Sequence, residues 1–161
     1  MARIDSDVRI HVPVLDRLID YEPQLSREPL ASRSKNLREL RLSVRRDLEW
    51  LLNTHEFAQD VPPGLKEVQH SLITYGLPDL TGSNPRHPIS QDQLCRTIAR
   101  KIGTFEPRLS GVMIRVVPGN EDERSLRLRI EAQLLVDPAP EFIAFDTQLD
   151  QELGLFSVKG N

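Results

Sequence analysis

The chain has 161 residues and a formal net charge of −3 at pH 7, with 39% hydrophobic and 28% charged residues. This length predicts one domain, large enough to form a hydrophobic core without a disulfide or a metal. The negative charge and the scattering of arginines among acidic residues argue against nonspecific nucleic-acid binding as the main activity. No apolar run has the length of a membrane span or the form of a signal sequence, and one cysteine excludes an intramolecular disulfide framework. We therefore expect a cytoplasmic protein, or one that does not depend on oxidation.

The start of the chain differs from the rest in composition. Residues 1–35 are mixed and interrupted by prolines, with too few apolar residues to form a core of their own. We predict an N-terminal arm here, with a short amphipathic piece at residues 14–19, followed by a single domain over residues 36–161.

Residues 37–53 give the clearest helical pattern. Their apolar residues recur at intervals of three and four, which places them on one face of a helix. Asn36 and Glu39 resemble a capping pair at its start. Arg41 lies close to the apolar face, so we expect its stem to pack while its head reaches a carboxylate. Trp50 lies off that face, which indicates a second buried face, where Trp50 packs against the arm.

Two more helices are predicted before the chain turns to strands. Residues 65–75 place their apolar residues on one face, and Gly76 suits the C-terminal cap of this helix. A long, proline-rich loop follows, of a length that is often functional. Ser90 and Gln93 then match the capping-box rule and open a third helix, which Gly103 ends.

The remainder of the domain has the patterns of β-strands. A short apolar run at residues 112–117 is followed by a strict alternation of aliphatic and polar residues over residues 126–136. A third strand is predicted at residues 142–149, and residues 153–158 add a short terminal strand. Three helices followed by a small, mainly antiparallel sheet define an α+β domain.

No arrangement typical of an enzyme or of a metal site is found. Cys95 is interpreted as a small buried side chain rather than a nucleophile. Nucleotide-binding loops and serine-hydrolase motifs are absent. Glu141 and Asp150 have the separation of two carboxylates in phage-type lysozymes, but Phe156 stands where a threonine should follow, so we interpret this pair as coincidence. The histidines, which are dispersed and lack the spacing of metal ligands, are His11, His55, His70 and His87. We expect no cofactor, no metal and no catalytic residue.

The most informative stretch runs from Phe105 to Ser110. Glu106 and Arg108 flank Pro107, where the helical pattern stops and the strand pattern begins. Proline fixes its own φ and biases Glu106 away from helix, so a stiff turn presents both charges. Two interpretations stay open. One is an internal salt bridge that ties the third helix to the sheet, and the other is a grip on a partner protein, for which arginine's planar fork is suited.

The edges of the predicted sheet are a second candidate for binding. A small sheet leaves edge strands that can accept a strand from a partner. The alternative is that the arm or the terminal strand covers these edges. The sequence does not indicate which strand is the accepting edge.

Several segments, in the right order, resemble one family. They are Val14–Leu18, Ser43–Thr54, Tyr75–Leu80, Phe105–Leu109 and Phe145–Asp150. Together they resemble the TssE family of type VI secretion baseplate proteins, relatives of the phage-tail baseplate wedge proteins called GPW. Glu106, Pro107 and Arg108 match the Glu-Pro-Arg signature of the family. His55 and Leu153 depart from its pattern, where an arginine and a threonine are expected.

The resemblance implies a structural, nonenzymatic role in a contractile injection machine. It implies a place in the baseplate wedge with TssF and TssG, with TssK nearby, in the cytoplasm at a membrane-docked baseplate. It also implies that the chain templates the first ring of the TssB–TssC sheath by strand exchange, with Glu106, Pro107 and Arg108 as partner-binding residues. Neither nucleic acid, a small-molecule substrate nor membrane insertion is implied. The alternative is a muramidase that opens the cell wall during assembly, since some members carry a lysozyme-like label.

Overall fold

The computed structural model describes residues 14–19, 24, 33–57, 61–62, 64–79, 88–118, 125–150 and 153–160 of the chain. Its elements are, in order, α1 (Val14–Leu18), α2 (Arg33–Asn53), α3 (Lys66–Gln69), the 3₁₀ turn η1 (Leu72–Thr74), α4 (Pro88–Phe105), β1 (Leu109–Val117), β2 (Ser125–Leu134), β3 (Glu141–Asp150) and β4 (Leu155–Gly160). Helices followed by an antiparallel sheet confirm the predicted α+β class.

The four strands form one antiparallel meander in the order β1-β2-β3-β4. β2 and β3 pair along their full length. β4 confirms the predicted terminal strand but is shorter than β3, and its last residue, Gly160, lies opposite Phe145. Within the described part of the chain, the start of β3 from Glu141 to Ala144 therefore has no neighbour on the β4 side.

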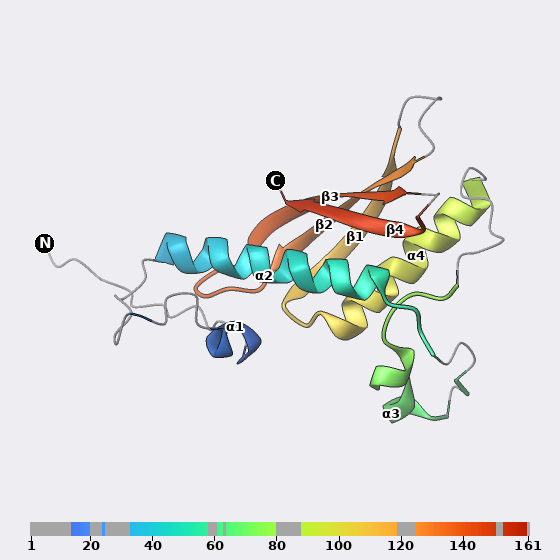
Figure 1. The fold of residues 1–161 in the computed structure, drawn as a ribbon, viewed down its shortest axis with the longest axis horizontal. Coiled ribbons are helices and arrows are strands. Elements are labelled where there is room, and N and C mark those ends of the chain that lie inside the picture. Colours follow the sequence, from blue (N-terminus) through green and yellow to red (C-terminus); the bar gives the residue numbers. More distant parts are fainter. Residues whose placement is uncertain are drawn as a thin grey trace, which may run out of the picture.

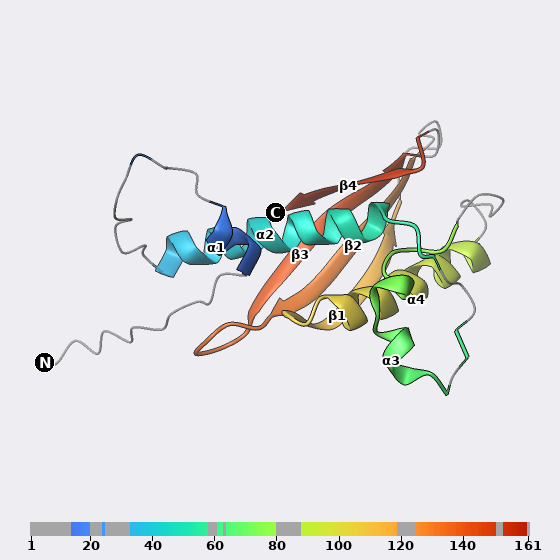
Figure 2. The same ribbon diagram turned by 60° about the horizontal axis from the view of Figure 1, so that its bottom comes forward.

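The two long helices lie against the sheet (Figures 1 and 2). α2 contacts β4, and α4 contacts β1, whereas α3 projects away from the sheet in both views. The alternation in β2 accounts for this layering, because Leu128 and Ile130 are buried and Arg127 on the opposite face is exposed. The domain thus has a helical layer on one face of the sheet and a polar outer face.

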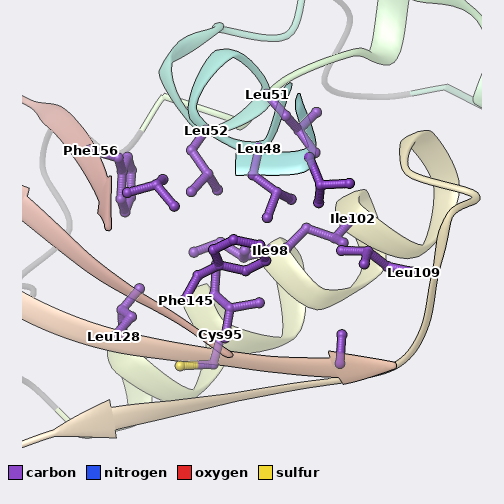
Figure 3. Packing of buried hydrophobic residues seen from close by; sticks show 14 of the residues in the cluster. Leu48, Leu51, Leu52, Cys95, Ile98, Ile102, Leu109, Leu128, Phe145 and Phe156 are labelled. Carbon is purple, nitrogen blue, oxygen red and sulfur yellow. The ribbon is translucent and has the colours of Figure 1, made fainter. Parts of the chain in front are cut away.

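The hydrophobic core lies between α2, α4 and the sheet. Figure 3 shows Leu48 of α2 and Ile98 of α4 near Phe145 of β3, and all three are buried. Each fully buried aliphatic side chain of this kind stabilises the fold by about 1.5–3 kcal/mol. The apolar faces predicted for the first and third helices, which correspond to α2 and α4, are confirmed, and so is the burial of Cys95.

Both predicted helix starts are wrong. α2 begins at Arg33, so Asn36 lies inside the helix rather than at its cap. α4 begins at Pro88, so Ser90 also lies inside its helix. Proline is favoured at the first helical position, because its missing N–H has no intrahelical partner there. Pro88 accounts in this way for the start of α4, where the capping-box pattern predicted Ser90.

The predicted end of the third helix is also wrong. α4 runs past Gly103 and ends at Phe105. A single glycine weakens a helix by only about 1 kcal/mol, which the buried face of α4 outweighs. The helix ends where Pro107 disfavours the helical conformation of Glu106.

α3 and η1 replace the continuous helix predicted over residues 65–75. The hydroxyls of Ser71 and Thr74 donate to carbonyl oxygens of α3, at 2.7 and 2.9 Å. These side-chain bonds satisfy carbonyls that a longer helix would use, so they compete with helix formation. Leu72, which we expected on a buried face, is 85% exposed.

Gly76 is a point of close backbone approach rather than a helix cap. Its φ is +103°, and a Cβ there would lie 2.3 Å from the carbonyl oxygen of Thr54. The N–H of Leu77 donates to the same oxygen at 2.8 Å, and the N–H of Glu56 donates to the carbonyl of Leu77 at 2.9 Å. The segment after α2 therefore pairs with the segment that follows η1.

The structure also corrects the prediction for Trp50. Its side chain is 52% exposed, and the guanidinium carbon of Arg46 lies 5.1 Å from its ring centroid. Arg46, rather than a second core, covers part of the ring, in a cation–π arrangement.

Helix α1 confirms a short helical piece in the predicted arm. Val14 and Leu18 at its two ends are exposed. Most of the predicted arm lies outside the described residues, as do most of the proline-rich loop after Leu77 and the turn between β1 and β2. The division into an arm over residues 1–35 and a domain over residues 36–161 stays a prediction.

Candidate partner-binding site

Glu106, Pro107 and Arg108 form the corner between α4 and β1. Pro107 is exposed at this turn, whereas Glu106 is only 4% exposed. The N–H of Leu109 donates to the carbonyl of Glu106 at 3.1 Å and closes the turn. The corner therefore presents its proline to solvent and buries its carboxylate.

Arg108 binds Glu106 directly. Its Nε donates to Oε1 of Glu106 at 2.6 Å, and its Nη2 donates to Oε2 of the same carboxylate. Two parallel bonds between a guanidinium and a carboxylate are among the strongest polar contacts in proteins. The internal salt bridge, one of the two interpretations of this segment, is present in the structure.

Helix α2 supplies two further acceptors for Arg108. Nη1 donates to Oγ of Ser43 at 3.1 Å, and Nη2 donates to Oδ2 of Asp47 at 2.6 Å. We call Ser43, Asp47, Glu106 and Arg108 the Arg108 cluster. Neither Ser43 nor Asp47 was predicted as a site residue, although their spacing of four places them side by side on the helix. Arg108 therefore links the corner between α4 and β1 to helix α2. Its bond to Glu106 also links α4 to the sheet.

The charges of the Arg108 cluster are balanced. Nε of Arg46 donates to Oδ1 of Asp47 at 3.1 Å, so two guanidinium groups face the carboxylates of Asp47 and Glu106. Burial lowers the pKa of Arg108, but the hydrogen bonds and charges of Glu106, and then those of Asp47, outweigh it and raise the pKa. Arg108 is therefore a permanent cation.

Arg108 keeps limited capacity for a partner. A guanidinium has five N–H donors, and the bonds to Glu106, Ser43 and Asp47 use four of them. Its side chain is 23% exposed. One N–H on Nη1 is left for an incoming acceptor.

Tyr75 and Phe105 flank the cluster. Their rings meet edge to face, with centroids 5.2 Å apart and an interplanar angle of 76°. Burial, then the negative charges of Asp47 and Glu106, raise the pKa of the Tyr75 phenol. The phenol is therefore held in its neutral form.

A second buried ion pair holds the segment between α2 and α4. Nζ of Lys101 bonds the carboxylate of Glu56 and donates to the carbonyl of Thr74 at 2.7 Å. Both charged side chains are less than 10% exposed. This pair was not predicted, although a lysine next to Ile102 on the apolar face of α4 is a signal for a buried charge that needs a partner.

The two outer strands of the sheet are protected in different ways. Asn53 donates to the carbonyl of Phe156 at 2.9 Å and accepts from its N–H at 2.7 Å, so a side-chain amide occupies the outer edge of β4. β1 carries a register shift between Ser110 and Met113, with Gly111 at a φ of +61°. Such a bulge discourages the addition of another strand.

Residues 38–139 match the family model described as baseplate wedge protein gp25, GPW_gp25. The chain belongs to this family. The match covers well over half of the chain, from α2 through β2, and includes all of the Arg108 cluster. No curated protein sequence matches the chain.

As a member of the baseplate wedge family, the chain is a structural baseplate component. In the described part of this family member, no helix is both long and apolar enough to cross a membrane. Those residues also hold no group of three or more side chains that suits a metal ion. His55 and His70 are exposed and separate, while His11 and His87 lie outside the described residues.

Cys95 does not have the environment of a nucleophile. Burial, followed by the charge of Asp92, raises the pKa of its thiol. A raised pKa disfavours the thiolate, which is the reactive form. The interpretation of Cys95 as a packing residue agrees with its place in the core of this baseplate wedge protein.

The lysozyme-like pair is also separated in space. Glu141 and Asp150 stand at opposite ends of β3, which puts them about 30 Å apart at the usual rise of a strand. Carboxylates of glycosidases lie roughly 5–9.5 Å apart. Glu141 instead accepts from Nη2 of Arg41 at 3.1 Å, which confirms that the head of Arg41 reaches a carboxylate.

Proposed function

We propose that the chain is a structural baseplate component of a contractile type VI secretion apparatus, which docks in the wedge and templates sheath assembly by strand addition. The observation that carries the proposal is the family match over residues 38–139. The type VI assignment rests on the resemblance to the TssE family. We also propose that the chain lies in the cytoplasm at a membrane-docked baseplate.

Strand addition is supported by the form of the sheet. The start of β3, from Glu141 to Ala144, pairs with β2 on one side and has no neighbouring strand on the other side in the described part of the chain. Backbone groups along such an edge pair with an incoming strand of any sequence, while side-chain pockets select among sequences. A first sheath ring that donates strands here would copy its register from β3.

Glu106, Pro107 and Arg108 are the proposed partner-binding residues. The exposed Pro107 and the spare N–H of Arg108 are the parts of the corner that a neighbour in the wedge or the sheath would contact. The internal bonds of Arg108 hold its guanidinium in place, which reduces the entropy lost on binding. A charge-assisted hydrogen bond to this donor contributes about 1.5–3 kcal/mol. The proposed partners are TssF, TssG, TssK and the sheath proteins TssB and TssC.

Seeded sheath assembly tests this function. Purified full-length chain, combined with TssF and TssG, is added in substoichiometric amounts to TssB and TssC, and sheath growth is followed by light scattering and electron microscopy. We expect the complete mixture to shorten the lag before growth, and Arg100→Gln, a charge change on the exposed side of α4, to behave as the wild type. A lag that is the same with and without the chain would contradict the proposal.

We also propose that the chain does not cleave peptidoglycan. The bonds of Arg108 to the buried carboxylate of Glu106 and the separation of Glu141 from Asp150 along β3 support this. A suspension of purified peptidoglycan should keep its turbidity when the chain is added. Clearing that is lost on replacement of a single Glu or Asp would instead support the muramidase alternative.

A further inference from the structure

We propose that a bay between α2 and the start of β3 binds an extended segment of a partner chain whose carboxylates alternate with apolar side chains. The arginine bay is defined by Arg38, Arg41, Arg45, Arg129, Phe142 and Gly160. This inference rests on the proposed strand addition and deepens it, because it names the accepting edge and the chemistry of the incoming strand.

The arginine bay exists because two neighbouring strands differ in length. β4 ends at Gly160 opposite Phe145, whereas β3 begins at Glu141. The C-terminal end of β4 lies beside the middle of α2 in both views (Figures 1 and 2), and the first half of α2 extends beyond it. The resulting cavity has a volume of about 480 Å³, within the range of roughly 300–1,000 Å³ that is usual for ligand pockets.

The backbone beside the arginine bay is open to pairing. On the side away from β2, the start of β3 from Glu141 to Ala144 has no partner strand among the described residues, and it spans about 10 Å at the usual rise per strand residue. A segment that enters here continues the lane of β4. The other free edges are less suitable, because Asn53 bonds the outer edge of β4 at Phe156 and β1 carries a bulge at Gly111.

The arginines of the bay have unused donors. Nε of Arg41 and Nε of Arg45 are buried and have no hydrogen-bond acceptor among the described residues, whereas Nε of Arg129 lies 3.5 Å from Oε1 of Glu131. Glu141 engages Nη2 of Arg41, but no carboxylate lines the bay itself. Buried donors without acceptors are rare and costly, and carboxylates are their strongest partners. The bay is therefore complementary to negative charge.

Apolar side chains define the other half of the specificity. Phe142 lies on the outer face of β3 and is 63% exposed, while Ile143 on the inner face is buried. Successive side chains of a strand point to opposite faces. An added strand would therefore direct one row of side chains toward Arg41 and Arg45 of α2. The other row would point to the outer face of the sheet, where Phe142 lies. Carboxylates suit the first row, and apolar side chains suit the second.

Peptide binding to the full-length chain tests the arginine bay. The probe is a blocked, fluorescent peptide of about nine residues, near 30 Å when extended, that alternates glutamate with valine. We expect saturable binding by anisotropy, together with slower hydrogen exchange at residues 141–144. Arg45→Gln should weaken binding about tenfold, as loss of one charged hydrogen bond does, and the matched Arg100→Gln should leave it unchanged. A peptide with lysine in place of glutamate should not bind.

A second variant fills the bay and keeps its charge. A Cβ at Gly160 would be 3.9 Å from Arg45 Cδ and from the Phe145 ring, which is ordinary contact, so Gly160→Phe should fold and block the peptide. Equal binding by polyglutamate of the same charge, full affinity in Arg45→Gln, or unhindered binding by a folded Gly160→Phe would overturn the proposal. Protection, before peptide is added, of those amides of residues 141–144 that face away from β2 would assign the bay to the chain itself, and would overturn the proposal too.

A failure of the proposed function and a failure of the arginine bay give different results. Loss of sheath seeding while the peptide still binds in the bay would contradict the proposed function and leave the bay intact. Normal seeding by a Gly160→Phe chain that no longer binds the peptide would contradict the bay alone.

Discussion

A single guanidinium joins three elements of this fold. Arg108 at the start of β1 binds Glu106 at the end of α4 and both Ser43 and Asp47 of α2. The carboxylate of Glu106 is almost fully buried, so its charge depends on this one partner. Arg108 can thus stabilise the fold and bind a partner at the same time, because the bonds that hold the corner also fix the remaining N–H on Nη1.

Replacement of Arg108 should destabilise the isolated chain. Arg108→Ala leaves the buried carboxylate of Glu106 without its counter-charge, and we expect a loss of about 3 kcal/mol in the free energy of unfolding. Arg108→Lys keeps the charge but loses the planar fork, so the loss should be smaller. Urea unfolding of the three proteins measures both effects. If Arg108→Ala has the same urea midpoint as the wild type, the Arg108 cluster does not stabilise the fold.

Gly76 should tolerate no side chain. Its positive φ alone strains an alanine by about 1–3 kcal/mol, and the Cβ would also collide with the carbonyl of Thr54. Gly76→Ala should therefore lower the melting temperature clearly. Gly103→Ala is the control, since a Cβ there meets no atom within 4 Å and alanine favours the helix by up to about 1 kcal/mol. Equal melting temperatures for the two variants would contradict the close approach.

Tyr75 should make the stability fall at alkaline pH. Its pKa is raised from an ordinary value of 10.0 in the folded state, so the unfolded chain loses this proton first. The stabilisation is complete below pH 10 and is lost as pH rises through the folded pKa. Tyr75→Phe should remove this part of the decline in stability, measured by urea unfolding between about pH 9 and 11. An unchanged slope in the variant would show that Tyr75 does not contribute.

At the level of elements, the segment between α2 and α4 is held by polar contacts rather than by a core. α3 has no buried residue, and Leu72 of η1 is largely exposed. The segment is fixed instead by the backbone pairing at Gly76 and by the Lys101–Glu56 ion pair. Such a segment unfolds locally when its few contacts are removed.

The Lys101–Glu56 pair should show strong coupling. Lys101→Met leaves the carboxylate of Glu56 buried and unpaired, and we expect it to cost about 3–5 kcal/mol. Glu56→Gln added to Lys101→Met should restore part of the loss, because no uncompensated charge then remains. A double-mutant cycle by chemical denaturation measures the coupling. Additive effects of the two changes would contradict a direct buried pair.

At the scale of the whole molecule, local patterns predicted the elements with strong periodicity. The alternation in β2 and the apolar faces of α2 and α4 settled the α+β class, because each pattern reports which side chains face the core. The helix over residues 65–75 failed, because the hydroxyls of Ser71 and Thr74 compete for carbonyls that a pattern of apolar residues cannot report.

The candidate site was predictable only in part. Glu106 and Arg108 were found because a proline between two charges at an element boundary is a local feature. Ser43 and Asp47 were not, since more than 60 positions separate each of them from Arg108 along the chain. The arginine bay escaped prediction for the same reason, because it needs the unequal lengths of β3 and β4 and the position of α2 above them.

The proposed function requires that the start of β3 receives a strand when the sheath assembles. Hydrogen exchange at residues 141–144, compared between the free chain and the chain assembled with TssB and TssC, measures whether this strand is added. For the amides of these residues that face away from β2, we predict slow exchange in the assembly and fast exchange in the free chain, because an added strand satisfies the open edge of β3. A sheath that forms while exchange at residues 141–144 stays fast would contradict the claim.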